Sequence, residues 1–191
     1  MHRGATAAIA GILILSPSPR VTAAPPVARY TANALNIGGD AGPAATLVSI
    51  TIDRWSSEDE HNQLADPLTN NAQADAAKAL RKLPRVGVIR ALDQNVEPLY
   101  YARRTAQPDG GERILLIGVR PMQSFEQWMK TNMSAFPFSV IQLVVDATGN
   151  GTGTLTLAAT LKGAREQPIT AVPDRFVLPV RLTKVKRVAD K

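Results

Sequence analysis

Arginine is the residue whose placement could do the most chemistry in this chain. Six arginines stand at the ends of expected strands or within them, at positions 54, 90, 103, 104, 113 and 120. A guanidinium binds a carboxylate or phosphate through two parallel hydrogen bonds and stacks on aromatic rings. Converging beside a Trp and a Tyr at one mouth of a barrel or sandwich, such side chains would form an anion pocket. The candidate ligand-binding residues are Arg54, Trp55, Arg90, Tyr101, Arg103 and Arg120.

The same arginines have a simpler, structural interpretation. They could pair with Asp53, Asp93 or Asp146 and so neutralise the ends of strands. A pocket requires convergence in space, which a sequence does not show. Both interpretations therefore stay open at this point.

His61 is the only histidine beyond the first two residues of the chain. Glu58 precedes it by three residues, a spacing that places two potential metal ligands on one helix face. No second pair lies nearby, so we expect a solvated first helical turn, with no metal site and no cofactor. A Ser-His-Asp triad would have to use this one histidine, and the common hydrolase motifs are absent.

An enzyme based on carboxylates is the alternative hypothesis. Asp53, Glu97, Glu112 and Asp146 could meet in space and act as a paired acid and base, while arginine holds a small anionic substrate. Their spacing does not predict such a meeting, and the interpretation leans away from catalysis. The glycine run at 149–153 leads into a strand and not a helix, so it predicts a hairpin turn rather than a phosphate loop.

The first 23 residues are typical of a secretory leader. His2 and Arg3 precede an apolar run over 5–15, shorter than the roughly 20 residues that span a bilayer. Small residues at 21–23 predict cleavage after Ala23, which leaves a domain over 24–191. We therefore expect export to the periplasm or the extracellular space, with no membrane anchor after cleavage and, in a chain without cysteine, no disulfide.

Charge and composition give little sign of a nucleic-acid partner. The formal charge of +6 falls by two if Arg3 and Arg20 leave with the leader, and aromatic residues make up 5% of the chain. Binding to single strands calls for a basic face interleaved with aromatic rings. A small-molecule ligand remains the expected partner, and the oligomeric state stays open.

Hydrophobic alternation predicts mostly strands after the leader. Ser57 and Glu60 form a capping box that predicts the start of a helix, and a second helical pattern covers 72–83 before Pro84. We expect a connecting segment over 122–133 and a last strand that Pro179 places at an edge or a bulge. The expected strands cover 27–37, 47–55, 86–92, 99–105, 113–119, 136–146, 152–161 and 176–185. The predicted fold is α+β: an antiparallel barrel or two-layer sandwich of about eight strands, with a helical hairpin inserted after the second strand.

The turn Asp109-Gly110 permits a prediction of strand register. Asp-Gly supplies the positive φ angles of a two-residue hairpin loop. With that loop, Tyr101 lies opposite Gly118 and Arg103 lies opposite Leu116.

Several short blocks of sequence resemble those of a protein family. The blocks are RWS at 54–56, LPxVGxIR at 83–90, YARR at 101–104, DGGERI at 109–114, RP at 120–121 and PFxVI at 137–141. In these blocks the chain resembles a group of uncharacterised exported bacterial proteins of similar length. The resemblance implies export and a single β-rich domain, and it assigns no catalytic residue.

Together these observations favour a soluble exported module that binds a small anionic or amphipathic ligand. The first alternative is an enzyme that uses carboxylates and arginine on a small anionic substrate. The second is a structural or interaction protein that uses a sheet edge, with the last strand as the candidate edge. An apolar cavity rimmed by arginine would favour ligand binding, whereas a cavity holding arginine and a perturbed carboxylate would favour the enzyme.

Overall fold

The computed structural model describes residues 25–35, 45–91, 96–120, 136–175 and 177–189. The expected leader and the whole of the connecting segment expected over 122–133 lie outside these ranges, as does Asp93. Within them the chain forms, in order, β1 (Ala28–Leu35), β2 (Ala45–Ile52), α1 (Glu58–Thr69), α2 (Gln73–Lys82), β3 (Gly87–Ala91), β4 (Val96–Leu99), β5 (Tyr101–Ala106), β6 (Glu112–Val119), β7 (Phe138–Val145), β8 (Asn150–Ala164), β9 (Gln167–Pro173) and β10 (Val180–Arg187).

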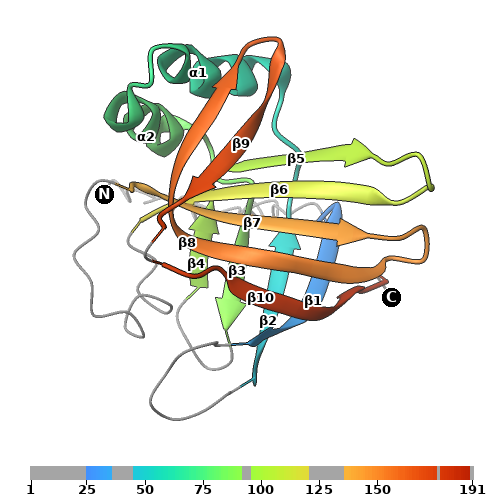
Figure 1. The fold of residues 1–191 in the computed structure, drawn as a ribbon. Helices are drawn as coiled ribbons and strands as arrows, with labels where there is room; N and C mark the ends of the chain where they lie inside the picture. The colour runs from blue at the N-terminus through green and yellow to red at the C-terminus, as the bar shows by residue number, and fades with distance from the viewer. Residues whose placement is uncertain (1–24, 36–44, 92–95, 121–135, 176, 190–191) are drawn as a thin grey trace, which may run out of the picture.

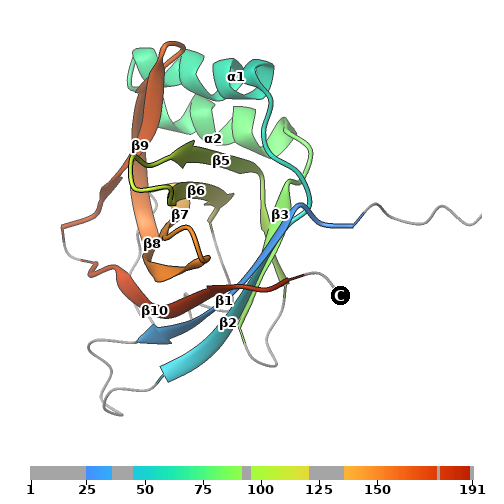
Figure 2. The same cartoon turned by 90° about the vertical axis from the view of Figure 1, so that its right-hand side faces the viewer.

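These strands form one antiparallel sheet in the order β4-β3-β2-β1-β10-β8-β7-β6-β5, and β9 pairs with β8 outside that path. The sheet curls until β5–β7 lie opposite β1–β3 (Figures 1 and 2). It does not close into a barrel, although its two edge strands, β4 and β5, are separated in the chain by Tyr100 alone. The α+β class and the helical hairpin after the second strand are confirmed, and a single curled sheet replaces the choice between barrel and sandwich.

Two features raise the number of strands from the expected eight to ten in the described ranges. The run expected as one strand over 99–105 is preceded by β4, and the chain changes partner at Tyr100, whose N–H donates to the Ile117 carbonyl. The other addition is β9, which sequence analysis missed because Pro168 and Pro173 interrupt its alternation.

The last strand, β10, is not an edge, which corrects one of the two expectations for it. It lies between β1 and β8 and pairs with both. The strand does contain a bulge, shown by a register shift in each ladder and by the positive φ of Lys184 (51°), but it lies near Lys184 and not at Pro179, which precedes the strand.

The inner face of the curled sheet is filled with aliphatic side chains. Val48, Ile50 and Ile52 point inward, as their alternation predicts, and each is fully buried. On β8 the expected phase holds through Leu157 and then changes, so that Leu161 is buried with the outer cluster instead. The change follows a register shift between β7 and β8, beyond which β8 turns up toward the helices (Figure 1).

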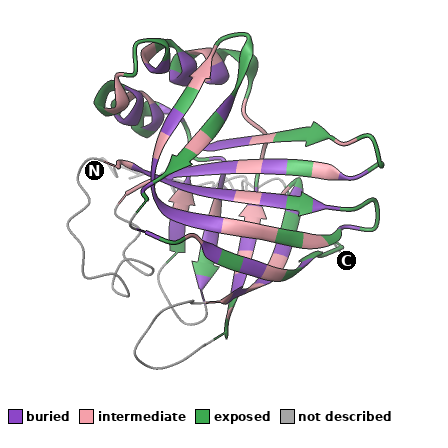
Figure 3. Ribbon diagram, in the orientation of Figure 1, coloured by how far each residue is buried: buried purple, intermediate pink, exposed green. Residues whose placement is uncertain are grey.

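The helical hairpin covers one end of the sheet's outer face. Its helix α1 begins at the expected capping box, in which the Ser57 side chain accepts from the Glu60 N–H and the Glu60 carboxylate accepts from the Ser57 N–H. Leu64 of α1 and Leu80 of α2 are fully buried in a second apolar cluster against β6, β7 and the far part of β8. Figure 3 shows this buried stripe beneath the helices, and mixed exposure on the outer face beyond them.

The β5–β6 turn differs from the expected two-residue loop. Tyr101 pairs with Ile117 and Arg103 with Leu115, one residue out of the expected register. Pro108 enters the loop because its fixed φ suits the second position of a type I turn. Gly110 follows with a φ of 80°, the combination typical of a three-residue hairpin loop with a glycine bulge.

Candidate ligand-binding groove

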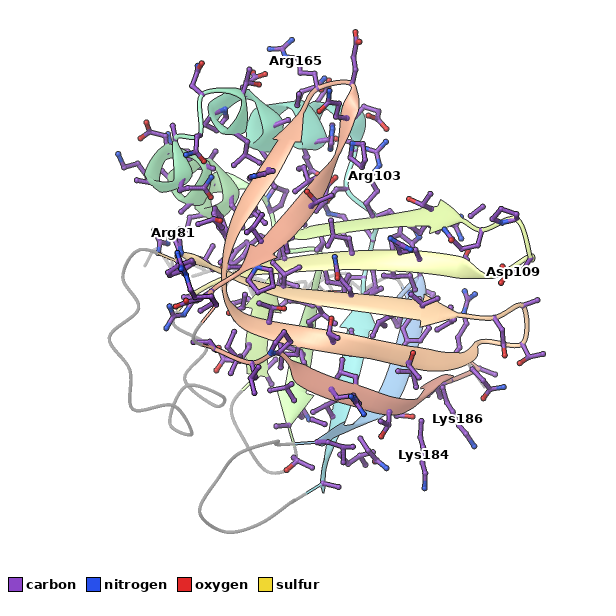
Figure 4. The ribbon with its side chains drawn as sticks, in the orientation of Figure 1. Arg81, Arg103, Asp109, Arg165, Lys184 and Lys186 are labelled. Carbon is purple, nitrogen blue, oxygen red and sulfur yellow. The ribbon has the colours of Figure 1, made fainter. Side chains whose placement is uncertain are left out.

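A groove of about 240 Å³ lies on the outer face of β5, β6 and β7, beside β9. The helical hairpin covers the neighbouring part of this face, and the β8–β9 hairpin stands up from the sheet as a wall (Figure 1). Figure 4 shows Arg103 between the helices and β5, and Arg165 at the tip of the β8–β9 hairpin. The groove is lined by Tyr101, Arg103, Thr105, Gln107, Arg113, Ile114, Leu115, Gln142, Pro168, Ile169 and Thr170.

Antiparallel register explains why these side chains share one face. Arg103 on β5 lies opposite Leu115 on β6, which lies opposite Gln142 on β7. The next row outward pairs Thr105 with Arg113. Since side chains of directly paired residues point to the same side of a sheet, two guanidinium groups and one amide surround Leu115.

Arg113 and Gln142 are two polar groups of this floor that are available to a ligand. Arg113 is exposed and Gln142 is partly exposed. Within the described ranges neither side chain makes a hydrogen bond or an ion pair. A guanidinium and an amide that lack protein partners, beside the apolar Leu115 and Ile169, suit a ligand with both an anionic and an apolar part.

Arg103 belongs instead to a chain of hydrogen bonds at the upper end of the groove. Its guanidinium donates to the Glu58 carboxylate, with 2.8 Å between Nη2 and Oε1, and to the Tyr101 hydroxyl. The Tyr101 hydroxyl lies 2.8 Å from Nδ1 of His61, whose Nε2 lies 3.2 Å from the Arg165 carbonyl. A carbonyl only accepts, so Nε2 carries the hydrogen, and in that tautomer Nδ1 accepts from Tyr101.

This network corrects the expectation that His61 lies in a solvated turn. Its residue is 2% exposed, and both of its ring nitrogens have partners. The expectation was wrong because the first turn of α1 packs against β5 and the β8–β9 hairpin. The side chain acts as a buried link between them.

The network also shifts two pKa values. Burial raises the pKa of Tyr101, and its hydrogen bond to Arg103 offsets only part of that rise. Burial is also the largest influence on Arg103 and acts to lower its pKa. The hydrogen bonds to Tyr101 and Glu58 outweigh burial, so the net pKa of Arg103 rises. Both side chains therefore keep their protons at neutral pH, Arg103 as a cation and Tyr101 as a neutral donor.

Only two of the six candidate ligand-binding residues, Tyr101 and Arg103, line the groove. Arg90 is exposed on β3, whose partners are β2 and β4. Arg120 follows β6 and donates to the Phe136 carbonyl at 3.1 Å. Arg54 and Trp55 lie between β2 and α1, so the six residues do not converge on one mouth.

Three of the six strand arginines, Arg54, Arg103 and Arg104, pair with acids, as the structural interpretation expects, but in the described part of the chain with glutamates and not with Asp53 or Asp146. Arg54 donates both of its terminal nitrogens to the Glu60 carboxylate at 2.8 Å. Arg104 pairs with Glu112 at 3.2 Å and lies over the Trp55 ring, 5.3 Å from its centroid. The Asp146 carboxylate is used within its own turn, where it accepts from Thr148 and Asn150.

The groove holds no carboxylate. Its lining includes neither Asp, Glu nor His, and Glu58 reaches it only through Arg103. In the described ranges no group of three or more potential metal ligands gathers. The geometry is that of an apolar and basic surface, and it lacks the paired carboxylates that the enzyme hypothesis requires.

The residues of this groove differ in how strongly the sequence indicates them. Arg113 was among the arginines noted in strands, and correct alternation along β6 would have placed it beside Arg103. Gln142 carries no signal of its own, because a single amide within an apolar strand has no characteristic spacing. The wall formed by β9 could not be expected once that strand was missed.

The chain matches no protein-family model, no curated protein and no solved structure. Among the described residues, no helix is both long and apolar enough to cross a membrane.

Proposed function

We propose that this protein is a binding module, acting outside the cytoplasm, for a small ligand with one anionic group and one apolar portion. The observation that carries the proposal is the pairing of Arg113, without a protein partner in the described ranges, with apolar Leu115 and Ile169 in one groove. The exported location rests on the leader expected over residues 1–23.

Different residues of the groove bind the anionic and the apolar parts of the ligand. Arg113 and Gln142 hold the anionic group through charge-assisted and neutral hydrogen bonds. Leu115 and Ile169 cover the apolar portion, and burial of that portion contributes about 25 cal/mol per Å² removed from water. The Glu58–Arg103–Tyr101 network fixes the upper end, because each of its side chains is held by the next.

Hexanoate is a suitable probe because it has one carboxylate and a short apolar chain. Titration calorimetry should detect its binding to the protein, and hexanol should bind at least roughly tenfold more weakly, since a hydrogen bond to a charged group contributes about 1.5–3 kcal/mol. The Arg113→Gln substitution should weaken the binding of hexanoate by a similar factor and leave the fold intact.

Arg90→Gln is the matched control. It removes the same charge from another exposed strand position, on β3, and should leave hexanoate affinity unchanged. Equal affinity in the wild type and in the Arg113→Gln protein, or no binding of hexanoate at all, would overturn the proposal.

A further inference from the structure

The groove is small for a site that encloses a whole ligand. Its volume of about 240 Å³ lies below the roughly 300–1,000 Å³ of ordinary small-molecule pockets. It is bounded on one side by β9, which contributes Pro168, Ile169 and Thr170 to the lining. A groove of this kind holds either a very small ligand or the end of a longer one.

The strand beside it, β9, has one edge that no other described strand covers. Within the described part of the chain it pairs with β8 alone, Leu161 opposite Ala171 and Lys162 opposite Thr170. The N–H and C=O of Leu161 are both taken by the Gln73 side-chain amide, each at 2.8 Å. Leu161 therefore points these groups away from β9, and in an antiparallel ladder Ala171 must point its own away from β8.

Ile169 lies against Gly163 of β8, beside the register shift between Lys162 and Ala164, and by the same alternation it presents its backbone N–H and C=O at this edge. The groove lies on that side, because its lining includes residues of β9 and none of β8. Pro168 and Pro173 bound the edge at both ends, which limits strand addition to a short segment.

We infer that the ligand of this groove is the carboxyl-terminal end of an extended peptide. The inference rests on the proposed function and names the chemical class of its ligand. The last peptide units add to β9 as a short extra strand, hydrogen-bonded to the backbone of Ile169 and Ala171. The terminal carboxylate contacts Arg113 and Gln142, and an apolar side chain near the terminus covers Leu115.

Charge and backbone chemistry together favour this occupant over a free fatty acid or a phosphate. The lining carries two arginines and no acid, which complements a terminal carboxylate. Strand addition satisfies main-chain groups that a fatty acid or a phosphate would leave to water, and it is a common mode of peptide recognition.

The test compares the tetrapeptide Ac-Ala-Leu-Ala-Leu with three relatives, by titration calorimetry on the wild-type protein. The free acid should bind more tightly than hexanoate. Amidation of its carboxyl terminus should weaken binding at least roughly tenfold, through loss of the contact with Arg113. Methylation of the backbone nitrogens should weaken it comparably, because each methyl removes a donor that strand addition needs. The third relative, the same sequence with a free amino terminus, should bind like the acetylated form.

Hydrogen exchange supplies a readout that affinity alone does not. The amides of Ile169 and Ala171 should exchange quickly in the free protein and slow at least tenfold when the peptide is bound. Those of Thr170 and Val172, which face β8, should change little.

Three failures are distinguishable. Hexanoate that binds through Arg113 while none of the peptides binds more tightly would overturn the peptide inference and leave the proposed function standing. No Arg113-dependent binding of either hexanoate or peptide would overturn both. Peptide binding that tolerates backbone methylation, with unchanged exchange at Ala171, would rule out strand addition.

Discussion

The two faces of the same three strands, β5, β6 and β7, serve opposite purposes. Their inner face is packed with fully buried aliphatic side chains such as Ile114, Leu116 and Ile141. Their outer face, one residue further along each strand, carries Arg113, Leu115 and Gln142 around a groove. The register of one hairpin decides which residues face which way.

The contrast shows which surface of this fold is available to bind a ligand. The curled interior is a packed core, and stability is its contribution. The outer face is left partly open because the helical hairpin and β9 cover only part of it. Polar side chains can remain without protein partners there, since water or a ligand satisfies them at little cost.

Neighbouring leucines on β6 provide the largest test of this contrast. Leu116→Ala should lower the free energy of unfolding by about 2–5 kcal/mol, because it opens a cavity in the inner core. Leu115→Ala should cost only about 1 kcal/mol, since Leu115 is partly exposed. Denaturation with urea measures both values.

Hexanoate binding should respond in the opposite order. Leu115→Ala should weaken it roughly fivefold through lost apolar contact, and Leu116→Ala should leave it unchanged wherever the variant is folded. Equal loss of stability in the two variants would contradict the assignment of the faces.

Sequence patterns predicted the inner face of this sheet better than the outer one. Alternation placed Val48, Ile50 and Ile52 correctly because a buried face imposes a strict apolar period on the sequence. A groove imposes no such period, and its residues come from strands whose register had first to be known. The single-residue error at Asp109-Gly110 was enough to set Arg103 opposite Leu116, a residue of the inner face.

The error at His61 has a non-local cause, unlike the missed strand β9, whose alternation is interrupted by Pro168 and Pro173. The burial of His61 depends on tertiary contacts between segments distant in sequence, as the bond from its side chain to the Arg165 carbonyl illustrates. The capping box at Ser57 and Glu60, by contrast, is a local interaction and was predicted correctly. The sequence predicts local interactions such as this one, whereas it does not predict that the helices pack against the β8–β9 hairpin.

The tyrosine at the boundary between helices and groove offers the next test. Tyr101→Phe should lower the free energy of unfolding by about 1–3 kcal/mol, because it leaves buried Nδ1 of His61 without a donor. Tyr100→Phe, one residue earlier and partly exposed, should change stability by less than about 0.5 kcal/mol. If the two variants are equally stable in thermal unfolding, the buried network contributes nothing to the stability of the fold.

The ion pair between Arg54 and Glu60 tests how the helical hairpin is attached to β2. The hydrogen bond from Arg54 holds the pKa of Glu60 below its ordinary value, and the Ser57 N–H adds to this while burial opposes it. Stability from the pair is therefore complete above the unfolded pKa of about 4.3 and is lost as pH falls through the lower folded value.

Glu60→Gln isolates that pair, since glutamine can still complete the capping box. The variant should be less stable by about 0.5–1.5 kcal/mol at pH 7, and the difference from wild type should vanish as pH falls from ~5 to ~3. Urea denaturation at each pH measures it. Asp66 and Asp146, whose pKa values are also lowered, are present in both proteins and cancel. A difference that persists at low pH would assign the loss to packing.

The smallest expected effect comes from a second Tyr→Phe substitution, at Tyr30 on the inner face. Tyr30 is 1% exposed, and among the described residues its hydroxyl has no hydrogen-bond partner. Removing an unsatisfied buried hydroxyl relieves a cost, so Tyr30→Phe should leave the free energy of unfolding unchanged or raise it by up to about 1 kcal/mol. Urea denaturation beside Tyr101→Phe then gives opposite signs for one chemical change on the two faces. A loss above about 1 kcal/mol in Tyr30→Phe would mean that its hydroxyl is bonded, and that the inner face also holds a polar site.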